Sequence, residues 1–405
     1  MRLLHTSDWH LGKTLGRISR HTEQESVLEE ICSIADREEA NVVLVAGDLF
    51  DTYNPDTESV ELFYRTLKKL TADGLRAVIA IAGNHDSPDR IEAPDPLARE
   101  CGIIFIGYPE TAVRPFRLAG GLEVTSARPG FLELMHPAWT YPLRILATPY
   151  ANEVRLRTAL SSTDPDAHLR TLLQSFWKDV SEACIDNKGV NISVAHLYVM
   201  KKGSPPPEEP EDEKPIGGIG GAQAVFVENF PKCLQYVALG HLHRGHVIAN
   251  SPCPIAYCGS PLAYSMSEAE QKKCVFIIDV EPSRPAQVRE VVLASGKTLY
   301  RKKFSGVTAA IAWLEKNRNS LVELTMETDD YLNADQRKSL YDAHDGIVDI
   351  IPCLHETKDA GSQQQIPNRL RPIEDLFFDY FLESEGQKPN SELLTLFDEI
   401  RGRKQ

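Results

Sequence analysis

The sequence predicts an α/β fold built on a buried, largely parallel sheet. Apolar runs rich in β-branched residues, which are typical of inner sheet strands, occur at 2–6, 41–45 and 77–81. Residues 23–38 and 57–70 carry apolar side chains at helical spacing, which predicts two amphipathic helices. This alternation of strand and helix places the chain in the α/β class.

A short polar phrase follows each of these predicted strands: SDWH at 7–10, AGDLFD at 46–51 and AGNHD at 82–86. Ligands bind at the carboxyl ends of the strands of an open α/β sheet, so the three phrases are expected to meet in one crevice. Carboxylate, amide and imidazole groups suit manganese, magnesium, iron or zinc ions. The sequence therefore predicts a metal site with the candidate residues Asp8, His10, Asp48, Asn84 and His85.

The second half of the chain supplies further candidate ligands. His196 ends an apolar strand, and another apolar strand leads into His241 and His243. Histidines two positions apart in an extended segment project to the same side, so both can reach one pair of ions. Asp48 is the expected bridge between two ions. The full set of candidate ligands is Asp8, His10, Asp48, Asn84, His196, His241 and His243.

Single members of this set have simpler explanations. Asn84 and Asp86 are residue types that favour turns, and a lone histidine at a strand end, such as His196, is more often structural. Five phrases in order, each at the exit of a predicted strand, favour a metal site over these explanations.

A pair of metal ions suits the hydrolysis of phosphodiesters, which are anionic and react very slowly without help. Two ions about 3.5–4 Å apart neutralise the phosphate charge and lower the pKa of a bridging water. The leaving oxygen still needs a proton. His85 is expected to supply it as a general acid, with Asp86 orienting its ring. The alternative is a structural role for His85 behind the metal ligands.

The order D-x-H, GD, GNHD, a strand-terminal histidine and GHxH resembles the calcineurin-like metallophosphoesterase superfamily. HTSDWHLGKTL, VLVAGDLFDTYNP, and GHLHRGHVI followed by YCGSPLAYSMSE are similar, more narrowly, to the SbcD family of nuclease subunits of bacterial SbcCD complexes. The likeness is strong over 1–279 and looser beyond. It implies a metallophosphoesterase sandwich of two sheets flanked by helices, with a small α+β capping domain and a C-terminal helical tail.

The resemblance also implies a role for each site residue. His85 is the catalytic histidine and binds no metal. Manganese is the expected ion, and magnesium is the alternative. One ion is held by Asp8, His10, Asp48 and His243, and the other by Asp48, Asn84, His196 and His241.

Three parts are expected along the chain. The resemblance assigns 1–280 to the nuclease domain, 281–370 to a capping domain that selects DNA ends, and 371–405 to helices that bind a partner ATPase. Prolines at 282–285 support the first boundary, and apolar residues at helical spacing support the helices of the tail. Packing of the tail on the capping domain is the alternative to partner binding.

Composition and charge narrow the class of protein. Of the 405 residues 42% are hydrophobic and 25% are charged, as in soluble globular proteins. No apolar run is as long as a membrane span, and a strand is predicted from residue 2, so we expect no membrane contact, no signal peptide and a cytoplasmic location. The eight cysteines lack any C-x-x-C pair, which favours reduced thiols.

The net charge of −14 disfavours a simple nucleic-acid binder. Local basic residues and a partner subunit are therefore expected to supply the DNA contacts. The candidates are Arg301, Lys302 and Lys303, which are interleaved with aromatic residues. A solvated edge strand is the simpler explanation of this segment.

The leading prediction is a two-metal DNA nuclease that acts on double-strand ends and hairpins in DNA repair, recombination and replication. By resemblance it is a 3′-to-5′ exonuclease and single-strand endonuclease. Its expected partners are DNA, an SbcC-type coiled-coil ATPase and a second copy of the chain. The dimer would use helices near 23–38 and 57–70, which could equally pack on their own sheet. A small-molecule or nucleotide phosphoesterase is the alternative enzyme, and a non-catalytic end-binding scaffold is the alternative of another class.

Overall fold

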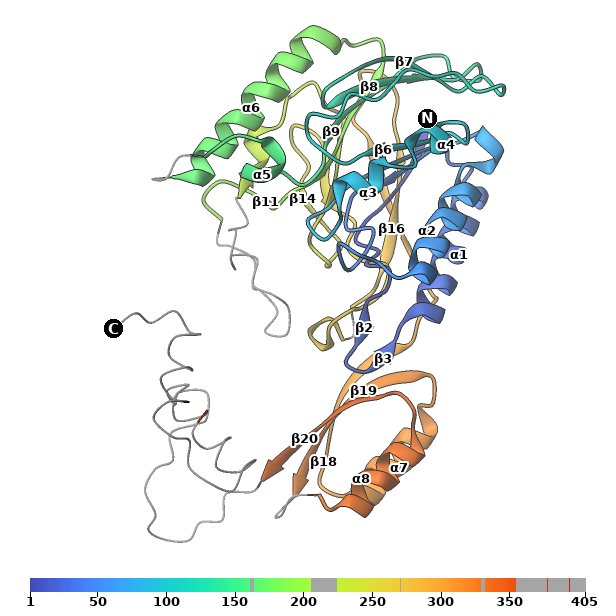
Figure 1. Cartoon of the computed structure of the whole chain (residues 1–405), viewed down its shortest axis with the longest axis vertical. Coiled ribbons are helices and arrows are strands. Elements are labelled where there is room, and N and C mark those ends of the chain that lie inside the picture. Colours follow the sequence, from blue (N-terminus) through green and yellow to red (C-terminus); the bar gives the residue numbers. More distant parts are fainter. Residues whose placement is uncertain are drawn as a thin grey trace. The chain divides into compact units, whose positions relative to one another are not determined.

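The computed structural model in Figure 1 describes residues 1–160, 164–204, 224–269, 271–328 and 332–354, together with Phe377 and Leu393. The chain divides into a compact unit of residues 1–354 and a second unit of residues 355–405. Apart from Phe377 and Leu393, the tail expected at 371–405 lies outside the described residues, as does most of the acidic, proline-rich segment at 201–221.

A six-stranded sheet carries the first three polar phrases. Its order is β17 (Gln287–Val292), β16 (Cys274–Asp279), β1 (Arg2–Thr6), β4 (Val42–Val45), β5 (Ala77–Ile81) and β6 (Ile103–Ile106). The four strands from β1 to β6 run parallel, and β16 and β17 extend the sheet antiparallel. The predicted parallel strands are confirmed, and their carboxyl ends share one edge of the sheet.

A seven-stranded sheet faces the first one. Its order is β14 (His246–Ala249), β15 (Ile255–Tyr257), β13 (Tyr236–Gly240), β10 (Val190–His196), β9 (Leu143–Thr148), β8 (Phe131–Met135) and β7 (Glu123–Arg128). Leu44 and Ile79 from the first sheet pack in one apolar cluster with Ile192 and Ala238 from the second. The structure therefore confirms a sandwich of two sheets.

Helices cover the outer face of the first sheet (Figure 1). They are α1 (His21–Arg37), α2 (Thr57–Leu70), η1 (Ala72–Gly74), α3 (Pro88–Glu92) and α4 (Asp95–Arg99). The α2 helix begins where Asp56 accepts a hydrogen bond from the Ser59 amide at 2.8 Å, a standard N-cap. It buries Phe63, Leu67 and Leu70, so the amphipathic helix predicted at 57–70 is confirmed.

The second sheet is covered by α6 (Pro165–Cys184), whose buried side chains include Leu169, Leu173 and Trp177 (Figure 1). Asp164 caps this helix by accepting a hydrogen bond from the Ala167 amide at 2.8 Å. The remaining short elements here are α5 (Glu153–Leu156), β11 (Val199–Met200), β12 (Val225–Phe226) and η2 (Val227–Asn229).

A smaller α/β module follows the sandwich. It is formed by β18 (Thr298–Phe304), α7 (Val307–Lys316), β19 (Ser320–Thr328), α8 (Ala334–Ala343) and β20 (Ile347–Leu354), with the three strands parallel. Both helices lie on one face of this sheet (Figure 1), and the module has its own apolar cluster, which contains buried residues of the helices and of the sheet. β17 follows the expected boundary at 280, but it is the edge strand of the first sheet and not part of this module. The division at 280 and 370 stays a prediction.

The module contacts the sandwich through a separate apolar cluster. Leu299 and Leu321 of the module pack there with Leu15 and Met266. Leu15 belongs to a hairpin of β2 (Thr14–Leu15) and β3 (Ile18–Ser19), and Met266 to η3 (Met266–Glu268). None of the described helices is long and apolar enough to cross a membrane.

A buried histidine between the two sheets makes stability depend on pH. His5 on β1 is fully buried, and its Nδ1 lies 2.9 Å from the Tyr236 hydroxyl. Burial lowers the pKa of His5 to about 3. Below pH 6.5 the unfolded chain therefore binds a proton that the folded chain excludes, and the free energy of unfolding falls as the pH drops from 6.5 toward 3.

We predict that His5→Gln removes this contribution, up to about 1.4 kcal/mol per pH unit. Urea unfolding at several pH values between about 4 and 7, in EDTA, measures the slope for both proteins. The slope of the free energy of unfolding against pH should be smaller in His5→Gln, by the amount that corresponds to the uptake of one proton on unfolding. Equal slopes would mean that His5 titrates alike in the folded and unfolded states.

Candidate metal centre

The expected ligands lie at or just after the ends of five strands, at one edge of the sandwich. Three of these strands are β1, β4 and β5, which are neighbours in the first sheet. The other two are β10 and β13, which pair in parallel in the second sheet. Because these strands are parallel, their carboxyl ends share one edge of the sandwich. The polar side chains that follow the strands therefore meet in one crevice.

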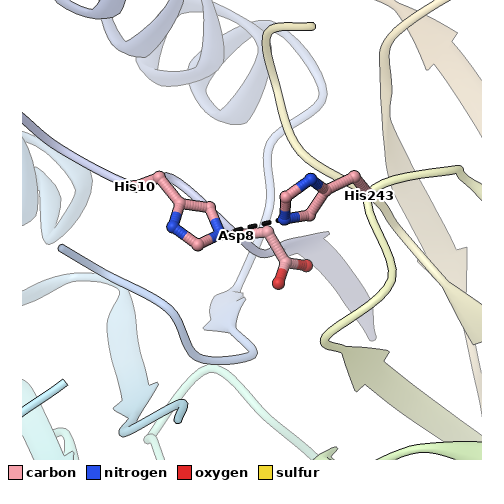
Figure 2. Close-up of side chains that lie close together, drawn as sticks. All are labelled: Asp8, His10 and His243. Atoms are coloured by element: carbon pink, nitrogen blue, oxygen red, sulfur yellow. Dashed lines mark hydrogen bonds between the residues drawn. The ribbon is translucent and has the colours of Figure 1, made fainter. Parts of the chain in front are cut away.

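Asp8, His10 and His243 form one group (Figure 2). Their ligand atoms lie within 4.8 Å of one another. The Nε2 atoms of His10 and His243 face each other at 3.0 Å. Oδ1 of Asp8 accepts a hydrogen bond from the His241 amide at 2.9 Å, which links this group to the next one.

Asp48, His196 and His241 form a second group of the same size. Nε2 of His196 lies 3.4 Å from Oδ2 of Asp48. The Asn84 side-chain oxygen lies 3.0 Å from Nε2 of His196 and 2.9 Å from Nδ1 of His241. Oδ2 of Asp48 is also 3.6 Å from Nε2 of His10, so this carboxylate lies between the two groups.

The loops hold several of these residues in a backbone conformation that is rare outside glycine. The φ angles of Asp8, His10, Asp48 and His241 are 52°, 43°, 47° and 110°. Each such residue costs about 1–3 kcal/mol, and the cost is common at functional sites. Backbone hydrogen bonds fix two of them, from the Asp8 amide to Gly47 O at 2.9 Å and from the His10 amide to Asp48 O at 3.0 Å.

Two glycines permit the close packing of the loops. A Cβ atom on Gly240 would lie 1.9 Å from the carbonyl oxygen of Ala46, and one on Gly83 would lie 2.1 Å from Oδ1 of Asp48. Real Cβ contacts are never so short, so any side chain at either position would push a loop of the site away.

Burial sets the charges in this crevice. It lowers the pKa of His10 to about 4 and that of His241 to about 3, so both rings are neutral and keep a lone pair. Burial also raises the pKa of Asp8 to about 6. For His196 burial acts in the opposite direction from the Asp48 carboxylate, and the carboxylate raises the pKa to about 9.

The donor set fits divalent cations. Among the described residues, Oδ2 of Asp8 and Nε2 of His241 are buried and have no hydrogen-bond partner. Buried polar atoms without a partner are costly, and a cation that accepts their lone pairs would remove the cost. Carboxylate, amide oxygen and imidazole ligands are those that manganese, iron and zinc ions bind.

His85 lies beside the two groups and is held by the backbone. Its amide donates to Oδ1 of Asp48 at 2.9 Å, and its Nδ1 lies 2.8 Å from the carbonyl oxygen of Asp51. A carbonyl oxygen only accepts, so Nδ1 carries a proton and Nε2 is the other edge of the ring. The two rings of His85 and His10 have centroids 4.8 Å apart.

The expected role of Asp86 was wrong in one respect. Asp51, not Asp86, contacts the His85 ring. The buried Asp86 carboxylate accepts hydrogen bonds from the amides of Leu49, Phe50 and Gly83 at 3.0, 2.9 and 2.8 Å. It therefore joins the loop that carries Asp48 to the loop that carries Asn84, because three amide donors surround it.

Arg155 is a site residue that the sequence did not reveal. It is 4% exposed, and its guanidinium donates to the carbonyl oxygens of Gly83 and Asp86 at 2.7 Å each. The same group lies 5.2 Å from the centroid of the Tyr150 ring. It thus holds both ends of the turn that contains Asn84 and His85. No sequence signal marks it, because its partners are carbonyl groups about 70 residues away.

The basic residues expected to contact DNA are engaged within the module. Arg301 pairs with Glu323 at 2.9 Å, and Lys303 pairs with Glu327 at 2.5 Å. Nζ of Lys302 lies 5.4 Å from the Tyr300 ring and 5.9 Å from the Trp313 ring. The carboxylates compensate the charges of Arg301 and Lys303 locally, and a role of the three residues in binding DNA stays a prediction.

Comparison with known proteins agrees with this geometry. Residues 1–245 match the model of the calcineurin-like phosphoesterase family. The SbcD subunit of the SbcCD nuclease of Bacillus subtilis (strain 168) is 38% identical over 99% of this chain and 97% of its own length. The SbcD subunit of Rhodobacter capsulatus is 31% identical over 69% and 66%, and that of Escherichia coli (strain K12) 27% identical over 84% and 81%.

The chain therefore belongs to the calcineurin-like phosphoesterase family and, within it, to the SbcD family of nuclease subunits. The predicted resemblance is confirmed. Members of this class are metal-dependent phosphodiesterases, which accounts for a crevice lined by carboxylates and imidazoles.

We predict that Asp86→Asn lowers the free energy of unfolding by about 2–4 kcal/mol, because the amide cannot accept from all three backbone donors. Urea unfolding in EDTA measures this change. Glu58→Gln, at an exposed position on α2, is the control and should change it by less than about 0.5 kcal/mol. An equally small change in Asp86→Asn would show that this carboxylate does not hold the loops together.

Proposed function

We propose that the protein is a two-metal DNA nuclease that hydrolyses phosphodiester bonds at double-strand ends and hairpins. Its activities would be 3′-to-5′ exonuclease and single-strand endonuclease. The observation that carries this proposal is the meeting of Asp8, His10 and His243 with Asp48, His196 and His241 in two adjacent groups. The similarity to nuclease subunits along almost the whole chain supports DNA over a small phosphoester as substrate.

Each group would hold one ion. Asp8, His10 and His243 would bind the first ion, and Asn84, His196 and His241 the second. Asp48 would bind both, because its Oδ2 lies close to ring nitrogens of both groups. When bound, two divalent ions, which we propose to be manganese, neutralise the charge of the phosphate and provide hydroxide at neutral pH.

His85 would protonate the departing sugar oxygen. The Asp51 carbonyl holds Nδ1 with its proton, so the ring can deliver a second proton only from Nε2. The hydrogen bond from the His85 amide to Asp48 fixes the distance between this ring and the metal-binding carboxylate. Arg155 assists by holding the carbonyl groups of Gly83 and Asp86 on either side of the turn.

Other subunits would complete the DNA-binding surface. The net charge of −14 is unsuited to a long DNA contact, and the bacterial relatives are named as one subunit of a complex. We therefore propose an SbcC-type coiled-coil ATPase as partner, bound through residues 371–405, and a homodimer of this chain. Both assemblies would work on cytoplasmic DNA.

We predict that His85→Ala lowers the rate of DNA cleavage by at least about 100-fold, because the leaving oxygen loses its proton donor. Metal content, measured by mass spectrometry, and DNA affinity should not change. If the metal content falls instead, His85 is a ligand. Asp48→Ala is the matched control and should lose both ions together.

The test of the proposed function is manganese-dependent degradation of a 3′-labelled DNA duplex by the purified protein and by His85→Ala. Degradation by the wild type alone is expected. If the wild type hydrolyses bis-p-nitrophenyl phosphate but no DNA, even with the coiled-coil ATPase added, the metal chemistry stands and the substrate is a smaller phosphoester.

A further inference from the structure

A buried ion pair lies directly behind one of the candidate metal ligands. Glu268, at the end of η3, and Lys273, before β16, are in contact, and their side chains are 2% and 10% exposed. Neither residue is one of the candidate metal ligands, although Glu268 ends the phrase YCGSPLAYSMSE. Both lie next to His243 (Figure 2 shows its ring beside His10 and Asp8).

The pair lies against His243 at two points, and one of them is a hydrogen bond. Oε1 of Glu268 lies 3.7 Å from Nδ1 of the His243 ring. Nζ of Lys273 donates to the backbone carbonyl oxygen of His243 at 2.9 Å. The opposite ring edge, with Nε2, faces His10 at 3.0 Å. The carboxylate and the candidate metal position therefore lie on opposite sides of one imidazole.

Glu268 is itself fixed by its surroundings. Its Oε1 accepts a hydrogen bond from the Tyr264 amide at 2.9 Å. Ser260 Oγ lies 3.4 Å from Oε2 of Glu268 and accepts from Nζ of Lys273 at 3.0 Å. Lys273 is in contact with Oε2 of Glu268, so its ammonium group balances the charge of this buried carboxylate.

Core packing alone does not explain such a pair. Two buried charges lose much of their hydration, and well-packed apolar residues of similar size would serve stability as well or better. Histidines that bind a metal commonly present their second nitrogen to a carboxylate, which fixes the ring and its proton. The position of Glu268 behind His243 has this arrangement.

We infer that Glu268 and Lys273 are positioning residues for His243. Glu268 keeps the proton of the ring at Nδ1, so Nε2 offers its lone pair toward the cation position shared with Asp8 and His10. Lys273 fixes the backbone of the same residue and balances the charge of Glu268. This inference rests on the metal binding in the proposed function and deepens it.

The test is calorimetric titration of manganese into the metal-free wild type, Glu268→Gln and Lys273→Met. We expect two ions in the wild type. In each variant we expect one of the two sites to bind about 10–100-fold more weakly and the other site to be unchanged. Glu268→Asp, which keeps the charge, should bind more tightly at the affected site than Glu268→Gln.

A structural role alone would show itself differently. Glu133→Gln is the matched control, because Glu133 pairs with the buried Arg144 at 2.7 Å on β8 and β9. Thermal unfolding in EDTA then separates folding from metal binding. The double variant Glu268→Gln/Lys273→Met, which buries no lone charge, replaces any single variant that does not fold.

Manganese affinity at both sites equal to that of the wild type in the folded variants would overturn the inference. So would an equal loss at both sites, or a loss of the same size in Glu133→Gln. A wild type that binds no manganese would instead contradict the proposed function itself, which distinguishes the two failures.

Discussion

The Asp48 carboxylate is the contact on which the rest of the site depends. Its Oδ2 lies 3.6 Å from a nitrogen of His10 and 3.4 Å from one of His196, and its Oδ1 accepts the His85 amide at 2.9 Å. One side chain thus links the loop after β1, the loop after β5 and the end of β10. The backbone of Asp48 is in the left-handed region, and this conformation lowers the stability of the folded protein.

The two facing sheets explain how that placement is maintained. Both sheets are parallel at their centre, so five loops emerge at one edge and can share a small volume. Gly83 and Gly240 allow those loops to approach within distances that a side chain would prevent. Buried groups then stiffen the loops: Asp86 joins two of them through backbone amides, and Arg155 holds one through backbone carbonyls.

The parallel strands and candidate ligands could be predicted because each polar phrase directly follows an apolar run. The common edge of the sheets predicted one crevice, whereas the grouping of Asp8 with His243, across more than 230 residues, followed from the family resemblance. The sequence predicted that Asp86 contacts the ring of its neighbour His85. Its carboxylate instead accepts hydrogen bonds from the amides of Leu49 and Phe50 on the loop after β4. Arg155 and Glu268 could not be assigned to the site, because no sequence pattern shows that they pack against the polar phrases at 82–86 and 240–243. The place of β17 was missed because strand propensity does not say which sheet a strand joins.

The most direct test of this account is anomalous diffraction at the manganese edge from crystals of the protein grown with manganese. Two peaks about 3.5–4 Å apart are expected, one beside His10 and His243 and one beside His196 and His241, with Asp48 between them. A single peak, or two peaks that do not share Asp48, would contradict it.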